Sequence, residues 1–217
     1  MSRLDGFGEA ELERVRAAVA RAEERTAGEL VTYLVGECDA YPEATWRGAA
    51  FGGLLGLATA AGFHDLLGLW SGLLLLWSAV PALLGAAAGV LLARIPTIRR
   101  ALISPREVER RVGLRAEAAF LEEEVFRTRD RSGILIFLAL FERRAVVLGD
   151  SGIYQVIAPE EWQAVVDSLI AGIHEGHAVD ALVAAVETCG RLLDERGIAI
   201  RPDDADELGD QPRVRER

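Results

Sequence analysis

Two long apolar stretches interrupt an otherwise polar pattern near the middle of the chain. Gly48–Phe63 contains no charged residue, and Leu66–Ala93 is a second uncharged run of 28 residues. A helix needs about 20 apolar residues to cross a bilayer, a length that the second run exceeds. The first run is shorter, about 24 Å if it is fully helical. The pattern predicts a transmembrane helical hairpin at 46–95, with His64 and Asp65 near its turn.

Aromatic residues and glycines favour this hairpin. Trp46 precedes the first run and Trp70 lies near its far end, where amphipathic rings collect at membrane interfaces. Five glycines recur at a spacing of four, which places them on one face of each helix and lets two backbones approach closely: Gly48, Gly52, Gly56, Gly85 and Gly89. The alternative is one spanning helix at 73–93, with 48–63 as an apolar core segment.

The arginines after the second run set the predicted orientation. Six of them fall within about 20 residues of its end, and cytoplasmic loops carry such an excess: Arg94, Arg99, Arg100, Arg106, Arg110 and Arg111. The expected location is therefore a bacterial plasma (inner) membrane, crossed twice, with the soluble domain and both termini cytoplasmic. Arg94, Arg99 and Arg100 could also bind lipid headgroups, at about 1 kcal/mol each near a charged surface.

Outside the hairpin, segments of helical and strand periodicity alternate. Helices are expected at 9–25, 105–128, from Pro159, and at 178–195, and strands at 29–35, 133–140 and 144–149. This order predicts an α/β fold, an αβα sandwich with a mixed sheet, interrupted by the transmembrane hairpin. The expected parts are 1–45 and 96–198 as the two halves of one domain, 46–95 as the hairpin, and 199–217 as an acidic disordered tail.

Charge and cysteine content narrow the class of protein. The net charge of −10 argues against nucleic acid as a partner, because such binding needs a basic surface. Two cysteines, Cys38 and Cys189, suit a reducing compartment and do not suggest a disulfide framework. The segment 1–25 is charged and amphipathic and has no apolar core of a signal peptide.

Several short motifs carry a resemblance to a known family. They are Ser132–Phe137, Phe141–Arg144, Gly149–Ile153, a helix with Trp162 near its start, and Thr26–Leu30 at the first strand. Their order and spacing resemble the TPM domain family, in its bacterial branch with membrane helices inserted in the domain. Since the two halves of such a domain fold together on one side, the resemblance implies an even number of membrane crossings.

The resemblance covers about residues 8–37 and 105–195 and implies several expectations. The family's fold is an αβα sandwich. Its members include a thylakoid acid phosphatase, a photosystem repair factor and a membrane auxiliary subunit of a neuronal receptor. Some relatives bind divalent cations and a few hydrolyse phosphomonoesters, so Ca²⁺ or Mg²⁺ is the expected cofactor.

Four residues are candidate metal ligands: Asp150, Ser151, Glu29 and Glu142. Oxygen ligands on loops suit Ca²⁺ or Mg²⁺. Glu142 and Asp150 flank one extended segment and should lie about 25 Å apart, so they cannot share one ion. Asp150 could instead combine with Ser151 and Glu29. In the competing interpretation Asp150 is a turn residue that bonds its own backbone, and Glu142 pairs with a neighbouring arginine.

Two functions follow from these observations. The first is a membrane-anchored, cytoplasmic-facing TPM-like module for binding or assembly, with gating by a divalent cation as one option. Its expected partners are membrane lipid and a membrane protein. The alternative is a metal-dependent phosphatase acting on phosphomonoesters, which would need clustered acidic ligands. The sequence offers scattered acids and no placed pair of nucleophile and base, which favours the first function.

Overall fold

The computed structural model describes residues 6–67, 74–198 and 207–216. The chain divides into two compact units. The first, here the α/β unit, comprises Met1–Asp39 and Glu109–Arg217. The second, here the hairpin unit, is Ala40–Val108. The hairpin unit is wider than the predicted insertion at 46–95, because the flanking residues also belong to its helices.

A four-stranded mixed sheet forms the centre of the α/β unit. Its order is β3-β2-β1-β4, with β1 at Glu29–Val35, β2 at Gly133–Ala139, β3 at Arg144–Gly149 and β4 at Arg213–Arg215. β1 and β2 are parallel over their whole length, from Glu29 opposite Gly133 to Val35 opposite Ala139. β3 returns antiparallel to β2, and β4 adds to the other edge parallel to β1. The first three strands lie where the sequence predicts them.

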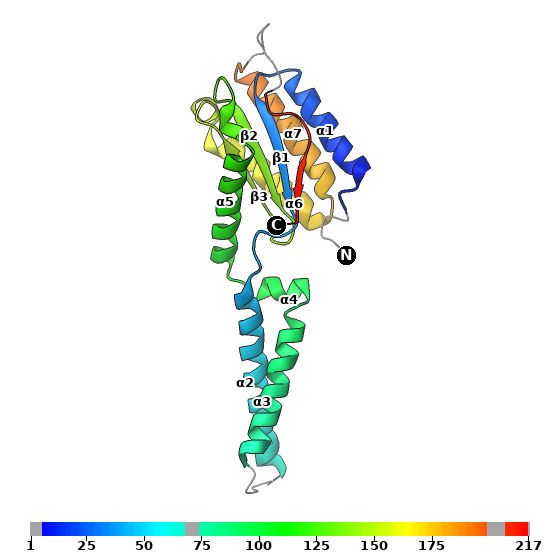
Figure 1. The fold of residues 1–217 in the computed structure, drawn as a ribbon, viewed down its shortest axis with the longest axis vertical. Coiled ribbons are helices and arrows are strands. Elements are labelled where there is room, and N and C mark those ends of the chain that lie inside the picture. Colours follow the sequence, from blue (N-terminus) through cyan, green and yellow to red (C-terminus); the bar gives the residue numbers. More distant parts are fainter. Residues whose placement is uncertain (1–5, 68–73, 199–206, 217) are drawn as a thin grey trace. The chain divides into compact units, whose positions relative to one another are not determined.

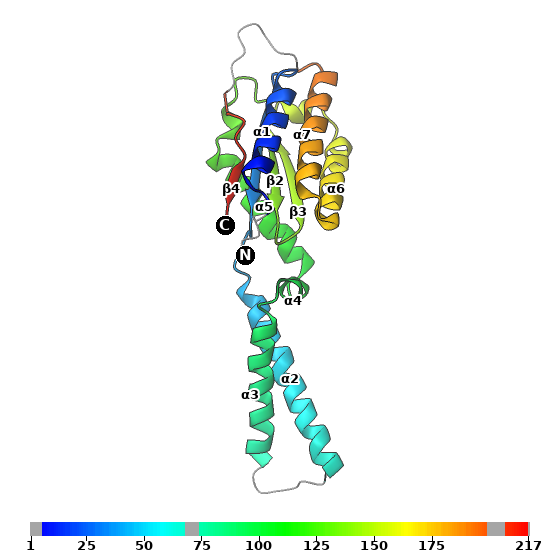
Figure 2. The same cartoon turned by 90° about the vertical axis from the view of Figure 1, so that its right-hand side faces the viewer.

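Helices cover both faces of this sheet. α1 (Glu9–Glu23), α6 (Pro159–Glu175) and α7 (Ala178–Glu195) lie on one face, and α5 (Pro105–Glu122) lies on the other (Figures 1 and 2). β1 and β2 are buried at every position, as expected for parallel strands covered on both sides. Their continuous apolar runs follow from this double burial.

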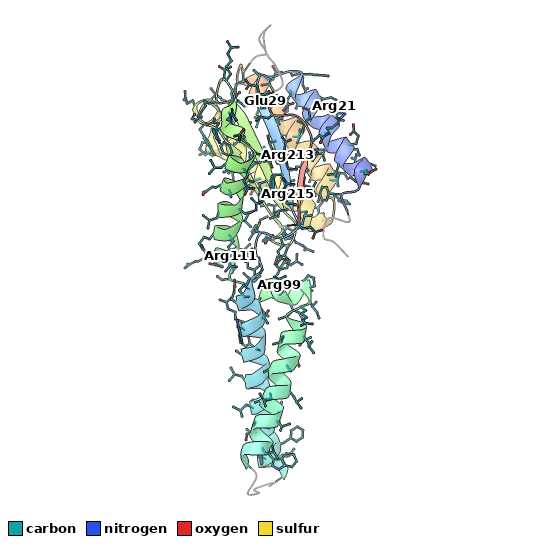
Figure 3. The ribbon with its side chains drawn as sticks, in the orientation of Figure 1. Arg21, Glu29, Arg99, Arg111, Arg213 and Arg215 are labelled. Carbon is teal, nitrogen blue, oxygen red and sulfur yellow. The ribbon has the colours of Figure 1, made fainter. Side chains whose placement is uncertain are left out.

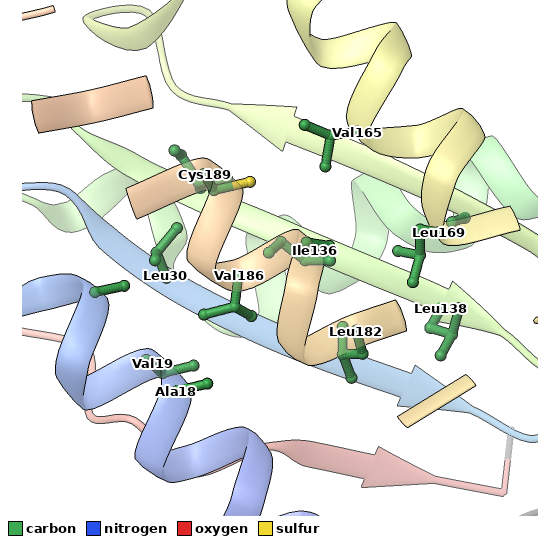
Figure 4. Packing of buried hydrophobic residues seen from close by; sticks show 14 of the residues in the cluster. Ala18, Val19, Leu30, Ile136, Leu138, Val165, Leu169, Leu182, Val186 and Cys189 are labelled. Atoms are coloured by element: carbon green, nitrogen blue, oxygen red, sulfur yellow. The ribbon is translucent and has the colours of Figure 1, made fainter. Parts of the chain in front are cut away.

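The main core lies between the sheet and the three helices α1, α6 and α7. Figure 4 shows Leu30 and Ile136 of the sheet facing Val186 and Cys189 of α7, with Val19 of α1 nearby. All five are fully or almost fully buried. Apolar residues at helical spacing on α7 therefore face apolar residues at alternating positions on the strands, which is how the sequence specifies this layer.

The core contains one buried hydroxyl that should destabilise it. Thr32 is 1% exposed, and within the described part of the chain its Oγ1 has no hydrogen-bond partner. We expect Thr32→Val to raise the free energy of unfolding by about 1 kcal/mol, because it removes an unpaired polar group from a strand. Thr128→Val is the matched control and should lower stability, since Thr128 Oγ1 accepts the Ser132 N–H at 2.9 Å. Urea unfolding checks both; a loss of stability in Thr32→Val would contradict the expectation.

The hairpin unit consists of α2 (Pro42–Leu67), α3 (Leu74–Leu92) and the short α4 (Pro96–Ala101). α2 and α3 pack backbone to backbone along their glycines. A Cβ added at Gly52 would lie 2.1 Å from the Gly85 carbonyl oxygen, and one at Gly89 would lie 2.0 Å from that of Gly48. The close approach predicted from the glycine spacing is therefore present. At its base, the Arg47 guanidinium donates to the Leu102 carbonyl oxygen at 2.6 Å.

The prediction that this hairpin is transmembrane is wrong. Among the described residues, no helix combines the length and the apolar character that crossing a membrane requires. α2 carries Glu43 and Arg47 near its start and His64 in its last turn. α3 has 19 residues, about 28 Å of helix, against a hydrocarbon core of about 30 Å. The predicted two-pass location in an inner membrane, with the domain facing the cytoplasm, is overturned by the same finding. The architecture is a mixed α/β fold with a helical hairpin.

Part of the C-terminal tail is ordered, contrary to the expectation of disorder for 199–217. Residues 207–216 are described, and β4 within them pairs with β1 from Tyr33 opposite Arg213 to Val35 opposite Arg215. Arg213 Nε also lies 3.0 Å from Glu123 Oε2. The acidic composition hides this strand, because its stability comes from backbone pairing and an ion pair rather than from apolar side chains.

Candidate functional site

Asp150 lies at the end of β3 and is held by its own turn. Its Oδ1 accepts the Ser151 N–H at 2.6 Å, and its Oδ2 lies 3.0 Å from Arg131 Nε. The side chain is 6% exposed. Oδ1 thus accepts a hydrogen bond from its own turn, as in the interpretation of Asp150 as a turn residue, whereas Oδ2 is paired with a guanidinium and accepts no hydrogen bond from the described part of the chain.

Glu29 and Asp150 lie at the same end of the strands, on β1 and just after β3, with β2 between them. Glu29 is opposite Gly133 of β2, and the Gly133 carbonyl oxygen accepts the Asp150 N–H on the other side. Glu29 Oε1 accepts the Glu207 N–H at 3.3 Å. The register thus brings Glu29, Asp150 and Ser151 to one end of the strands, but each carboxylate accepts a hydrogen bond from a different segment of backbone.

Glu142 lies at the other end of the strands, in the turn from β2 to β3. Its Oε1 accepts the Cys38 N–H at 2.9 Å, and its side chain is 7% exposed. Burial raises the pKa of the Cys38 thiol, and the nearby Glu142 carboxylate raises it further. The thiol therefore stays protonated at neutral pH, and Glu142 ties the turn between β2 and β3 to the segment that follows β1. Glu142 and Asp150 cannot bind the same ion, because they lie at opposite ends of β3, as predicted from the sequence.

The predicted ligands do not form one metal site. Glu142 lies at one end of the strands, and Glu29, Asp150 and Ser151 lie at the other. A bound Ca²⁺ takes six to eight oxygen ligands, which must converge on one point. Within residues 6–67, 74–198 and 207–216, no group of three or more His, Cys, Asp or Glu side chains could hold a metal ion. The residues nominated from the sequence thus do not suit a bound Ca²⁺ or Mg²⁺ as a set.

Two arginines of α5 contact β1 or the segment that follows it, and neither was nominated as a site residue from the sequence. The Arg115 guanidinium lies 5.1 Å from the centroid of the Tyr33 ring, donates to the Tyr33 hydroxyl and pairs with Glu122 at 3.1 Å. Arg111 pairs with Asp39 at 2.9 Å. Figure 3 shows Arg111 and Glu29 at opposite ends of the α/β unit. The sequence did offer an indication of this pair, because Arg111 and Arg115 are four residues apart and so share one face of the predicted helix.

Tyr33 is buried beneath Arg115. Burial raises the pKa of the Tyr33 hydroxyl, and the Arg115 guanidinium opposes that rise. The Tyr33 ring also stacks on Phe137 of the neighbouring strand, with centroids 5.6 Å apart. These contacts anchor α5 on the sheet.

The arginines proposed for lipid headgroups have different surroundings. Arg99 donates to the Ala40 carbonyl oxygen, and its guanidinium lies 6.0 Å from the Tyr41 ring centroid. Arg94 and Arg100 are exposed and half-buried, respectively. Arg99 therefore helps to fix the base of the hairpin unit.

An apolar groove of about 620 Å³ runs along α2 and α3. Phe51 and Leu55 of α2 and Leu84 and Leu92 of α3 line it, and each of the four is at least half exposed. The groove floor includes the glycines of both helices. One lining side chain carries a hydroxyl, Thr59, and it already donates to the Gly56 carbonyl oxygen at 2.8 Å. Such a surface favours an apolar ligand.

Comparison with known proteins supports the fold alone. No protein-family model matches the chain, and no curated protein matches it. Among solved structures, the chain is similar to the NMR structure of BA42 from the psychrophilic bacterium Bizionia argentinensis. The TM-score is 0.60 at 18% sequence identity, over 99% of each chain. At this identity the similarity extends to the arrangement of the elements and not to a site.

Proposed function

We propose that this chain is a binding and assembly module. In this proposal, the α/β unit is the scaffold and the hairpin unit is the element that docks an apolar surface of a partner protein. A single observation carries the proposal: the large apolar side chains of α2 and α3 are exposed in the isolated chain. The most exposed are Leu66 at 80%, Trp46 at 75% and Leu83 at 70%.

The size of this surface supports the proposal. Among the described residues of the hairpin unit, four aromatic residues are more than half exposed: Trp46, Phe51, Phe63 and Trp77, at 75%, 65%, 62% and 53%. With about 200 Å² for each such side chain, they alone present on the order of 500 Å² of apolar surface. Exposed leucines add to this area, whereas the largest apolar patch on a typical monomer is about 300–600 Å² and often functional. A partner that covers the hairpin would remove this surface from water.

The resemblance to the TPM family also favours binding over catalysis. That family includes a repair factor and an auxiliary subunit besides its acid phosphatase, so catalysis is not its common property. The phosphatase alternative draws on the same resemblance, but the carboxylates nominated for it have structural partners in this chain. A phosphatase needs ligands that converge on one metal, or a nucleophile beside a base.

Site-specific photo-crosslinking tests the proposal. A benzoylphenylalanine placed at Leu84, on the groove, should crosslink the full chain to a protein in the bacterial cell. The same probe at Leu121 of α5 should not, although Leu121 is 63% exposed and Leu84 67%. The difference is expected because the probe at Leu84 lies on the docking surface.

Two outcomes would contradict the proposal. One is crosslinking that is equal at Leu84 and Leu121. The other is hydrolysis of p-nitrophenyl phosphate by the purified chain that depends on Mg²⁺ or Ca²⁺ and is lost in Asp150→Ala, because that result would establish catalysis.

A further inference from the structure

We infer that the partner of the hairpin is a second copy of the same chain. The two hairpins would pack antiparallel, groove to groove, as a four-helix arrangement. This inference rests on the proposed function, because it names the occupant of the docking surface. Three observations carry it: the area available, the absence of charge on the contact surface, and the position of the basic residues.

The groove supplies apolar area for a contact between two copies. A specific protein interface buries about 800 Å² on each partner. Of the exposed apolar side chains, Phe51, Leu55, Leu84 and Leu92 line the groove and are each at least half exposed. Leu54, Leu83 and Leu91 are exposed outside the groove lining, so a contact of that size would also have to cover apolar side chains that flank the groove.

The groove and its rims are self-complementary in chemistry. Phe51 and Leu55 of one rim and Leu84 and Leu92 of the other stand beside a floor of glycines. A two-fold axis would place the rims of each copy over the floor of the other, as side chains of one helix pair insert between those of another. Because Thr59 bonds its own helix, no polar group in the groove would lose a water partner without compensation.

Charge favours this surface and an antiparallel arrangement. Each copy has a net charge of −10, so two copies repel over most surfaces. The runs Gly48–Phe63 and Leu66–Ala93 contain no charge. Basic residues gather at one end of the hairpin, at Arg94, Arg99 and Arg100. A parallel pair would bring these arginines together, whereas an antiparallel pair separates them by about the 28 Å length of α3, several Debye lengths at physiological salt.

Sedimentation equilibrium of the full chain without detergent tests the inference. Over about 1–100 µM, the range of moderately tight complexes, we expect a mass twice the 23.5 kDa of one chain. Leu84→Arg should weaken association at least 100-fold, because it would bury a charge without a partner; 100-fold corresponds to about 2.7 kcal/mol. Leu55→Arg on the other rim should act alike. Leu121→Arg is the matched control and should leave the dimer intact.

The possible results separate the inference from the proposed function. A dimer that is lost in both groove variants and kept in Leu121→Arg, with unchanged near-UV circular dichroism, supports the inference. A monomer at every concentration overturns it, and so does a dimer that persists in both groove variants. Flotation with phosphatidylglycerol vesicles, if it replaces self-association and is lost in Leu84→Arg, would assign the groove to lipid and also overturn it. In the crosslinking experiment, a product of another mass than the dimer would overturn the inference and leave the binding module standing.

Discussion

Replacing Gly52 by alanine is expected to open the α2–α3 hairpin. The added Cβ would lie 2.1 Å from the carbonyl oxygen of Gly85 and 3.1 Å from the Cα of Gly89, both parts of the facing backbone. Because backbone cannot rotate away as a side chain can, the helices must separate along the whole seam. We expect a net loss of about 2 kcal/mol, after alanine's better helix propensity has offset part of the overpacking.

Hydrogen exchange measures this loss where it occurs. Amides of α2 and α3 should lose about 30-fold in protection, the equivalent of 2 kcal/mol, while those of β1 and β2 change little. Gly62→Ala is the matched control on the same helix, since a Cβ there meets no described atom within 4 Å. It should raise protection in α2 by up to about 1 kcal/mol. An equal response of the two variants would show that the glycine seam does not hold the hairpin.

The glycine seam shows what the sequence could and could not predict about the hairpin. The spacing of Gly48, Gly52 and Gly56 indicated a close helix pair, and the backbone distances agree. The same apolar runs also suggested lipid around the hairpin, because periodicity reports that side chains avoid water and not what covers them. Among the described residues, no helix has both the length and the apolar character of a membrane span.

The sheet was predictable except for its last strand. Glu29–Val35 and Gly133–Ala139 are rich in β-branched and aromatic residues and bury both faces, so their composition indicates strands. Arg213–Arg215 has one apolar residue and follows an acidic segment. Its place beside β1 depends on an unpaired strand edge and on Glu123, about 90 residues earlier in the chain. No local pattern carries that information.

The positions of the candidate ligands at strand ends could be predicted from the sequence, but the groups that they contact could not. Asp150 forms the bond to its own turn that the sequence suggested, whereas Glu142 accepts the N–H of Cys38, a residue far away in the sequence. Their partners come from register and from distant segments: Arg131 for Asp150 and Cys38 for Glu142. A chemical group of the right type at a strand end is therefore a weak indication of a metal site, since backbone groups at the same place compete for its oxygens.

The α/β unit should lose stability between about pH 4.5 and pH 8 because of Glu23. Burial of this carboxyl raises its pKa from 4.5 to about 8, and the nearby carboxylates of Glu29 and Asp210 add to the rise. The Leu30 N–H, which donates to Glu23 Oε1 at 2.7 Å, opposes it. Below pH 4.5 Glu23 is protonated in both states, so the stability is full. Between the two values the unfolded chain releases a proton that the folded chain retains, and stability falls as the pH rises.

Glu23→Gln is expected to flatten this pH dependence. Each pKa unit corresponds to about 1.4 kcal/mol, and partial exposure of Glu23 and its interaction with Asp210 reduce the total to the order of 2 kcal/mol. Glutamine keeps an oxygen for the Leu30 N–H but does not titrate, so the variant should be more stable than the parent at pH 8 and similar at pH 4.5. Glu13→Gln on the same helix is the control, since its side chain is 63% exposed and it should leave the slope unchanged. Urea unfolding across this pH range gives the slope, and a parent protein whose stability is constant from pH 4.5 to 8 would show that Glu23 ionises without cost in the folded chain.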